Sequence, residues 1–158
     1  MKFRFLYWIF LFLSVIFAGI VTEANMPFYI RILGVVFIIY GVVLNFLAGK
    51  TLKKYAHKTK TQGFSVPDKF TKDGIFACMR HPGQFGNMFL MAGVGIVSGS
   101  WYALAYSGWA VFFGALFILY VEEKEAIEKY GSEYCEYIKT TAPFKISVEC
   151  IKKAFKAI

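Results

Sequence analysis

Long stretches without a charged residue alternate along the chain with segments rich in lysine. Residues 5–21 and 32–49 carry no charge. Each is long enough for one membrane-spanning helix, because about 20 residues, at about 1.5 Å each, cross a hydrocarbon core of about 30 Å. Residues 83–121 are also uncharged, with a break at residues 98–100 (Ser-Gly-Ser). The pattern therefore predicts four transmembrane helices, at about residues 4–22, 27–49, 83–98 and 101–121.

The composition supports an integral membrane protein. Of the 158 residues, 58% are hydrophobic, 20% aromatic and 18% charged, whereas a soluble domain is about 45–50% apolar and about 25% charged. These values exclude a disordered chain and argue against an ordinary soluble globule. The first apolar stretch has the basic start of a secretory signal peptide, but it is long and aromatic and has a poor cleavage pattern. We therefore expect it to be retained as a helix.

The distribution of positive charge predicts the orientation in the membrane. Residues 50–80 carry a net charge of +6, residues 1–31 carry +2, and residues 122–158 are neutral overall. Because cytoplasmic loops are enriched in Lys and Arg, we expect the basic loop and both termini in the cytoplasm and the turn at 98–100 outside. The total charge of +8 does not indicate nucleic acid binding, because the basic residues are separated from the apolar ones.

Outside the spans, short polar segments are expected to complete a single membrane domain. Residues 61–71 have loop composition. Residues 122–139 are predicted to continue the fourth helix, with an interruption near Gly131 and an end at 140–143. The tail suits a short helix, lying either beside anionic lipid or against the cytosolic segment. The expected parts are two N-terminal transmembrane helices (1–49), a basic cytosolic loop (50–82), a transmembrane hairpin (83–121) and a cytosolic helical cap (122–158).

Two polar clusters are predicted to meet at the cytoplasmic ends of the third and fourth helices. Arg80, His81 and Pro82 directly precede the third helix, and Glu122 and Glu123 directly follow the fourth. The tight turn between these helices makes them antiparallel, so the clusters should lie side by side. Each cluster alone has an ordinary explanation, since proline suits a first helical turn and glutamates suit a solvated helix start. Together they form a candidate site.

The remaining polar and sulfur-containing residues give weaker signals. Cys78, Cys135 and Cys150 have neither CxxC nor metal-ligand spacing, so we expect neither a disulfide scaffold nor a metal site. The sequence also contains no dinucleotide-binding, Walker or nucleophile-elbow motif.

Glycine and tyrosine spacings point to packing as much as to chemistry. Gly95 and Gly99 form GxxxG, which is typical of close helix packing. Tyr130 and Tyr134 are four residues apart and are expected to share a helical face. Aromatic rings near carboxylates either hold a cation or pack at a membrane boundary, and the sequence leaves both readings open.

From about residue 70 to 145 the chain resembles a known family. The residues Gly74, Phe76, Arg80–His81–Pro82, Gln84 and Gly86 are similar to the signature G-x-Y-x-x-x-R-H-P-x-Y-x-G of the isoprenylcysteine carboxyl methyltransferase-like family, which includes phospholipid methyltransferase relatives. Here Phe76 and Gln84 stand in place of tyrosines. A second signature, E-E-x-x-L-x-x-x-F-G-x-x-Y-x-x-Y-x-x-x-x-P, is similar to the stretch from Glu122 to Pro143.

The resemblance implies an all-α integral membrane methyltransferase that uses S-adenosylmethionine. It implies a cytosolic cofactor pocket capped by the C-terminal segment and an acceptor that enters from the lipid. The implied catalytic residues are Arg80, His81 and Glu123. The implied cofactor-binding residues are His81, Pro82, Gly86, Glu122, Glu123 and Tyr134. No metal is implied.

The roles within this site and the acceptor stay open at this stage. Glu122 or Glu123 would bind the ammonium group or stabilise the sulfonium, and Arg80 or His81 would bind the carboxylate of the cofactor. His81 would instead be a base if the acceptor is an amine or a thiol, whereas a prenylcysteine carboxylate needs none. Two alternatives remain, an NADPH-dependent reductase of the sterol-reductase type and a non-enzymatic membrane subunit. The sequence predicts no oligomeric state.

Overall fold

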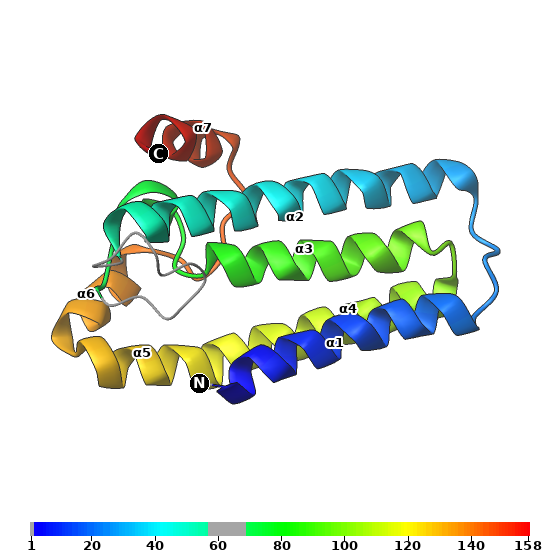
Figure 1. Ribbon diagram of the computed structural model, residues 1–158, viewed down its shortest axis with the longest axis horizontal. Coiled ribbons are helices and arrows are strands. Elements are labelled where there is room, and N and C mark those ends of the chain that lie inside the picture. The colour runs from blue at the N-terminus through cyan, green and yellow to red at the C-terminus, as the bar shows by residue number, and fades with distance from the viewer. Residues whose placement is uncertain (1, 57–68) are drawn as a thin grey trace. The chain divides into compact units, whose positions relative to one another are not determined.

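Helices form all the regular structure in the part of the chain that the computed structural model describes, residues 2–56 and 69–158 (Figure 1). The elements in chain order are α1 (Lys2–Val21), α2 (Phe28–Tyr55), the 3₁₀ helix η1 (Gly74–Ala77), α3 (Pro82–Val97), α4 (Trp101–Phe117), the π-helix η2 (Ile118–Glu122), α5 (Glu123–Tyr130), α6 (Ser132–Thr140) and α7 (Val148–Ala157). The predicted all-α class is confirmed.

Three helices among the described residues are long and apolar enough to cross a membrane. They are α1, α2 and the continuous helix Trp101–Tyr130, which comprises α4, η2 and α5. The span predicted at 83–98 corresponds to α3, which has only 16 residues. These rise about 24 Å, less than a hydrocarbon core of about 30 Å, so the fourth span stays a prediction.

The basic loop begins later than expected, because α2 continues to Tyr55 instead of ending at about residue 49. Most of the predicted loop at 61–71 lies outside the described residues, apart from its last residues, which are not helical.

Internal contacts divide the chain into two compact units. Unit 1 comprises residues 1–42 and 86–117, and unit 2 comprises residues 43–85 and 118–158. Each unit thus combines two stretches that are far apart in the sequence. The expectation of a single membrane domain stays a prediction.

Aromatic residues pack α1 against α4 within unit 1 (Figure 1). The ring of Tyr7 stacks on that of Phe117 with centroids 4.3 Å apart, and its hydroxyl donates to the carbonyl of Phe113 at 3.1 Å. A Cβ at Gly114 would lie 3.0 Å from the ring of Trp8, so the glycine makes room for the indole. Most apolar side chains of α1 are exposed, as expected for a helix that faces lipid.

Glycines bring α2 and α3 close together in unit 1. A Cβ at Gly93 would lie 2.6 Å from Ile38 Cγ1 and 2.8 Å from the carbonyl oxygen of Gly34. A Cβ at Gly41 would lie 2.6 Å from the carbonyl oxygen of Gly86. Larger residues would push these backbones apart, so this contact depends on small residues, as in many membrane helix pairs.

The predicted close packing at Gly95 is confirmed, whereas Gly99 has a different role. A Cβ at Gly95 would overlap the hydroxyl of Ser107 on α4. Gly99 has φ +78° in the turn between α3 and α4, a conformation that favours glycine. Next to this turn, Arg31 Nε donates to the carbonyl of Val97 at 2.9 Å.

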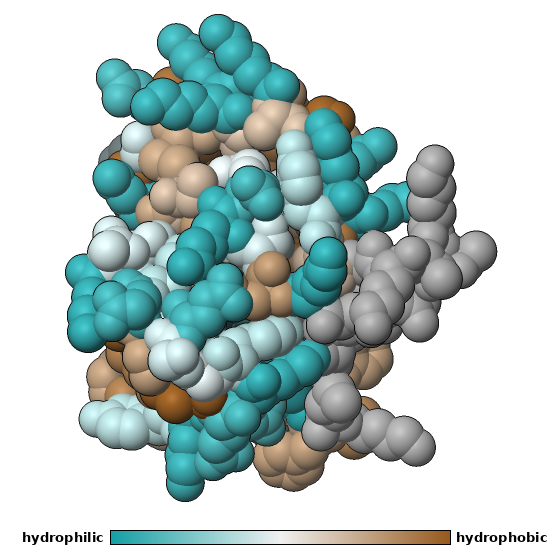
Figure 2. Space-filling model, turned by 90° about the vertical axis from the view of Figure 1, so that its left-hand side faces the viewer, coloured by the Kyte–Doolittle hydropathy of each residue, from teal (hydrophilic) through white to brown (hydrophobic). Residues whose placement is uncertain are grey.

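Unit 2 contains the polar helices, and the face drawn in Figure 2 is largely hydrophilic. The predicted interruption is confirmed at Gly131, whose φ of +61° separates α5 from α6. Tyr130 and Tyr134 therefore lie on different helices, so the expectation that they share one helical face is wrong. Their rings are still neighbours, with centroids 6.4 Å apart.

The C-terminal helix α7 packs against η1 and the end of α2 within unit 2, whereas we expected it either beside lipid or against residues 122–139. Ser147 caps it by accepting a hydrogen bond from the backbone N–H of Cys150 at 3.3 Å. Cys150 and Ala154 are buried, and the carbonyl of Ala157 accepts a hydrogen bond from the hydroxyl of Tyr55 at 2.9 Å.

Candidate functional site

The two predicted polar clusters come together in unit 2. Arg80 donates to Glu123 Oε1 from Nε at 2.9 Å and from Nη2 at 2.6 Å. His81 Nε2 lies 3.2 Å from the same oxygen. Gln84 Nε2 donates to Glu122 Oε2 at 2.6 Å. Because Arg80, His81 and Glu122 are only 8%, 6% and 3% exposed, these interactions form a buried polar site rather than a solvated helix start.

The local backbone places each of these side chains. Arg80 and His81 end the segment before α3, and Pro82 is the first residue of that helix, which begins one residue earlier than predicted. Glu122 ends the π-helix η2, and Glu123 begins α5. A π-helical turn is rare and is often found at functional sites. It was not predicted from the sequence.

The guanidinium of Arg80 is bonded within the protein through all three nitrogens. Besides the two bonds to Glu123, Nη1 donates to the carbonyl of Ile138 at 3.1 Å and to the carbonyl of Thr141. Arg80 thereby ties α5 to the end of α6. The predicted contact of Arg80 with a cofactor carboxylate stays a prediction.

Residues 141–147, which we call the strap, connect α6 to α7 and bind directly to the site. The backbone N–H of Arg80 donates to the carbonyl of Ala142 at 3.0 Å, and that of His81 donates to the carbonyl of Pro143 at 3.2 Å. The ring of Phe144 stacks on Phe85 with centroids 5.2 Å apart and lies 6.4 Å from the His81 ring. The strap therefore covers the two residues that begin the site.

Tyr134 lies beside His81, with its hydroxyl 3.5 Å from His81 Nε2. Burial, together with the negative charge of Glu123, raises the pKa of Tyr134 to about 12. The hydroxyl therefore stays protonated at neutral pH. Its ring is only 4% exposed and packs against Phe70 with centroids 5.6 Å apart. This contact favours packing over an open aromatic face for a cation.

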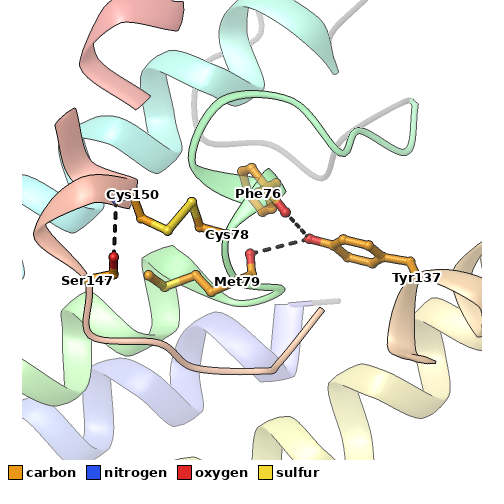
Figure 3. Close-up of a disulfide and its surroundings, with 6 residues drawn as sticks. All are labelled: Phe76, Cys78, Met79, Tyr137, Ser147 and Cys150. Carbon is orange, nitrogen blue, oxygen red and sulfur yellow. Dashed lines mark hydrogen bonds between the residues drawn. A yellow bond between two sulfur atoms is a disulfide. The ribbon is translucent and has the colours of Figure 1, made fainter. Parts of the chain in front are cut away.

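Tyr137 positions the segment that leads to Arg80. Its hydroxyl donates to the carbonyl of Phe76 and lies 3.3 Å from the carbonyl oxygen of Met79 (Figure 3). Burial raises its pKa, so this donor is also protonated at neutral pH. Its partners are backbone carbonyls, which no sequence pattern marks.

Gly86 makes none of the contacts given above for this cluster. It lies on α3 in unit 1, where its carbonyl faces Gly41. Its predicted part in cofactor binding, like that of Pro82, stays a prediction. Gln84 stands where the family signature has tyrosine, and its side chain donates a hydrogen bond to Glu122.

A disulfide joins Cys78 to Cys150, with Cα atoms 5.9 Å apart (Figure 3). It links the segment just before Arg80 to the first turn of α7. The two cysteines are 72 residues apart in the sequence and match no motif, so the pair was not predicted from the sequence. Cys135 is a free cysteine.

The charges of the cluster favour some ligands over others. One guanidinium and two carboxylates sum to −1 when His81 is neutral and to zero when it is protonated. Electrostatic interactions are strong in such a buried site. A cationic or zwitterionic ligand fits this balance, and a ligand with several phosphates does not.

A family model extends over both polar clusters. The model of the phospholipid methyltransferase family matches residues 29–133, well over half of the chain. Comparison with curated proteins and with solved structures gives no match.

Proposed function

Because the chain belongs to the phospholipid methyltransferase family, we propose that it transfers a methyl group from S-adenosylmethionine to a lipophilic acceptor at the cytosolic face of the membrane. The acceptor is an isoprenylcysteine carboxylate or a related lipid-borne group. The observation that carries the proposal is the buried cluster of Arg80, His81, Glu122 and Glu123.

The donor set suits this cofactor. When bound, S-adenosylmethionine supplies an activated methyl group on a positively charged sulfur, together with an ammonium and a carboxylate group. A cluster with a charge of −1 or zero favours that ligand, whereas the phosphates of NADPH would lie against two carboxylates. The charge balance thus supports a methyltransferase over the reductase alternative.

Each residue of the cluster has a distinct proposed task. Glu122 faces the positive charges of the cofactor, and Gln84 fixes the orientation of that carboxylate. His81 binds the polar end of the cofactor. Arg80 holds Glu123 and the strap in place. Methyl transfer needs alignment and exclusion of water more than acid–base chemistry, and a buried site under the strap provides both.

Ligand binding in detergent tests the proposal most directly. Calorimetry should detect S-adenosylmethionine and not NADPH. The Glu122→Gln variant should bind S-adenosylmethionine about 10- to 100-fold more weakly, because a hydrogen bond to a charged group is worth about 1.5–3 kcal/mol. Glu128→Gln is the matched control, since Glu128 is exposed on α5. Binding of NADPH alone would favour the reductase, and binding of neither would favour a non-enzymatic subunit.

Binding and kinetic measurements distinguish two roles for His81, as a cofactor ligand or as a general base. As a cofactor ligand, its loss in His81→Ala should weaken S-adenosylhomocysteine binding and raise the KM for the donor. As a general base, its loss should leave binding intact and lower kcat by about 10²–10⁴-fold. We propose the first role because His81 and Arg80 both contact the same carboxylate oxygen of Glu123 inside the polar cluster. Parental affinity with a collapsed kcat would refute it.

Labelling of single cysteines tests the cytosolic location. Tyr102 and Lys152 are both exposed, so Tyr102→Cys and Lys152→Cys in a background without native cysteines give two accessible probes. We expect Tyr102→Cys to react from outside and Lys152→Cys only after permeabilisation. Labelling of both from the same side would contradict the proposed topology.

A further inference from the structure

The Cys78–Cys150 disulfide closes a covalent loop that contains the strap. Cys78 lies two residues before Arg80, and Cys150 lies in the first turn of α7, directly after the strap. The strap is thus fixed at one end by α6 and at the other by the disulfide. Between these ends its carbonyls hold the backbone N–H groups of Arg80 and His81. The disulfide therefore restrains the segment that covers the polar cluster (Figure 3).

The expected location makes a permanent disulfide at this place unusual. The lysine distribution predicts that residues 50–80 and the C-terminal segment face the cytoplasm. Cytosolic thiols are kept reduced, and disulfides that form there are mostly transient, serving catalysis or redox sensing. A bonded cysteine pair in that compartment points to a reversible couple.

We infer that Cys78 and Cys150 form a reversible thiol–disulfide couple whose oxidation tightens ligand binding at the Arg80–His81 site. This inference rests on the proposed function for the identity of the ligand and for the cytosolic location. Oxidation joins the two sulfurs, releases two protons and passes two electrons to a disulfide such as glutathione disulfide, which becomes two thiols. A reduced dithiol reverses the reaction and is itself oxidised to a disulfide.

Exposure decides where the exchange begins. Cys78 is half-buried, whereas Cys150 is only 8% exposed. An incoming thiolate therefore attacks the sulfur of Cys78, and Cys150 leaves as the thiolate. In the opposite direction, Cys78 forms the mixed disulfide and Cys150 resolves it.

The coupling to the site follows from the freedom of the strap. In the reduced protein, the strap is held at its second end only by non-covalent contacts, among them the Ser147 cap and the Tyr55 hydrogen bond to α7. A ligand that is bound beneath the strap must suppress this extra freedom. In the oxidised protein the disulfide has already restricted it, so binding is tighter.

Thermodynamic reciprocity makes the test sharp. We expect S-adenosylhomocysteine to bind about tenfold more tightly to the oxidised than to the reduced protein, within the usual range of coupling between sites. The ligand must then shift the thiol–disulfide equilibrium by the same factor, about 30 mV for a two-electron couple. Titration in glutathione buffers, read by alkylation and mass spectrometry, measures that shift. Equal affinities and no shift would overturn the inference.

Cysteine variants test whether the redox response comes from this pair of thiols and not from the loss of any one thiol. Cys150→Ser should bind like the reduced protein in every buffer. Cys135→Ser, which removes the free cysteine of α6, should retain the full redox response. A redox response that persists in Cys150→Ser would refute the assignment.

A readout without ligand keeps this inference independent of the proposed function. Hydrogen exchange at the backbone N–H groups of Arg80 and His81 should be slower in the oxidised protein, because the strap carbonyls that they bond are then restrained. If neither form binds S-adenosylhomocysteine but exchange still differs, the proposed function fails and the couple stands. Equal exchange in both forms would overturn the couple.

In intact cells, the couple should respond to oxidants. Trapping with an alkylating reagent should find Cys78 and Cys150 largely reduced in growing cells and joined after treatment with a thiol oxidant. A bond that persists in untreated cells and resists dithiol reductant in the native protein would overturn the inference.

Discussion

Different interactions stabilise the interior of unit 1 and the interior of unit 2. Unit 1 relies on shape, with glycine backbones such as Gly41 and Gly93 in direct contact with neighbouring helices and apolar side chains directed outward. Unit 2 relies on polar bonds, with Arg80 and its partners buried together and a disulfide beside them. Membrane helices without a hydrophobic driving force between them depend on close packing. Buried charges require complete pairing. Substitutions should therefore fail for different reasons in the two units.

The largest effect is expected where a charge pair is broken in unit 2. Arg80→Ala leaves Glu123 without its cationic partner and the carbonyls of Ile138 and Thr141 without their donor. The free energy of unfolding should fall by about 3–5 kcal/mol, the usual cost of an uncompensated buried charge. Chemical unfolding in detergent measures it. Lys153→Ala, at an exposed position on α7, is the control and should change stability by less than about 0.5 kcal/mol.

The addition of a single methyl group should lower the stability of unit 1. In Gly93→Ala the new Cβ would meet Ile38 and the backbone of Gly34, and backbone cannot move aside cheaply. The cost should be about 1–3 kcal/mol of unfolding free energy, typical of overpacking. Gly108→Ala has open space within 4 Å and should be neutral or stabilising by up to about 1 kcal/mol. Equal effects of the two variants would refute the packing argument.

Loss of one hydroxyl in unit 2 should have a smaller effect. Tyr137→Phe removes the hydrogen bond to Phe76 and the contact with Met79, so the segment before Arg80 loses part of its support. Stability should fall by about 1 kcal/mol, the net worth of a typical hydrogen bond. Thermal unfolding would measure it against Tyr102→Phe, which changes an exposed hydroxyl in unit 1 and should have no effect.

The smallest difference at neutral pH is expected for Tyr134→Phe, and it should depend on pH. The pKa of Tyr134 is raised above its ordinary value of about 10 to about 12 in the folded protein. Its contribution to stability is therefore complete below about pH 10 and is lost as the pH rises through about 12. The parent should lose more stability than Tyr134→Phe over that range. Parallel curves of melting temperature against pH would contradict the raised pKa.

Local sequence signals predicted most of the fold. Apolar runs marked the long helices, Gly131 marked the break between α5 and α6, and the spacing of the tail marked α7. The end of α2 was misjudged because lysines stop an apolar run without stopping a helix. The fourth span stays a prediction because the 16 residues of α3 are too few to cross a whole hydrocarbon core.

The site was predictable only where topology brought distant residues together. A tight turn between the third and fourth helices predicted that Arg80 and His81 lie beside Glu122 and Glu123, and the contacts agree with this prediction. The bonds from Arg80 to the carbonyls of Ile138 and Thr141 carry no sequence signal, because any residue supplies a carbonyl. The Cys78–Cys150 pair depends on how the strap returns to the site, which no motif encodes.

The balance of one guanidinium against two carboxylates also bears on product inhibition. In the proposed reaction, methyl transfer would remove one positive charge from the ligand, while the side chains keep theirs. Glu122 would then attract S-adenosylmethionine more strongly than the spent S-adenosylhomocysteine, and the product would compete poorly for re-entry. In Glu122→Gln this preference should shrink, and accumulated product should slow the enzyme at lower conversion.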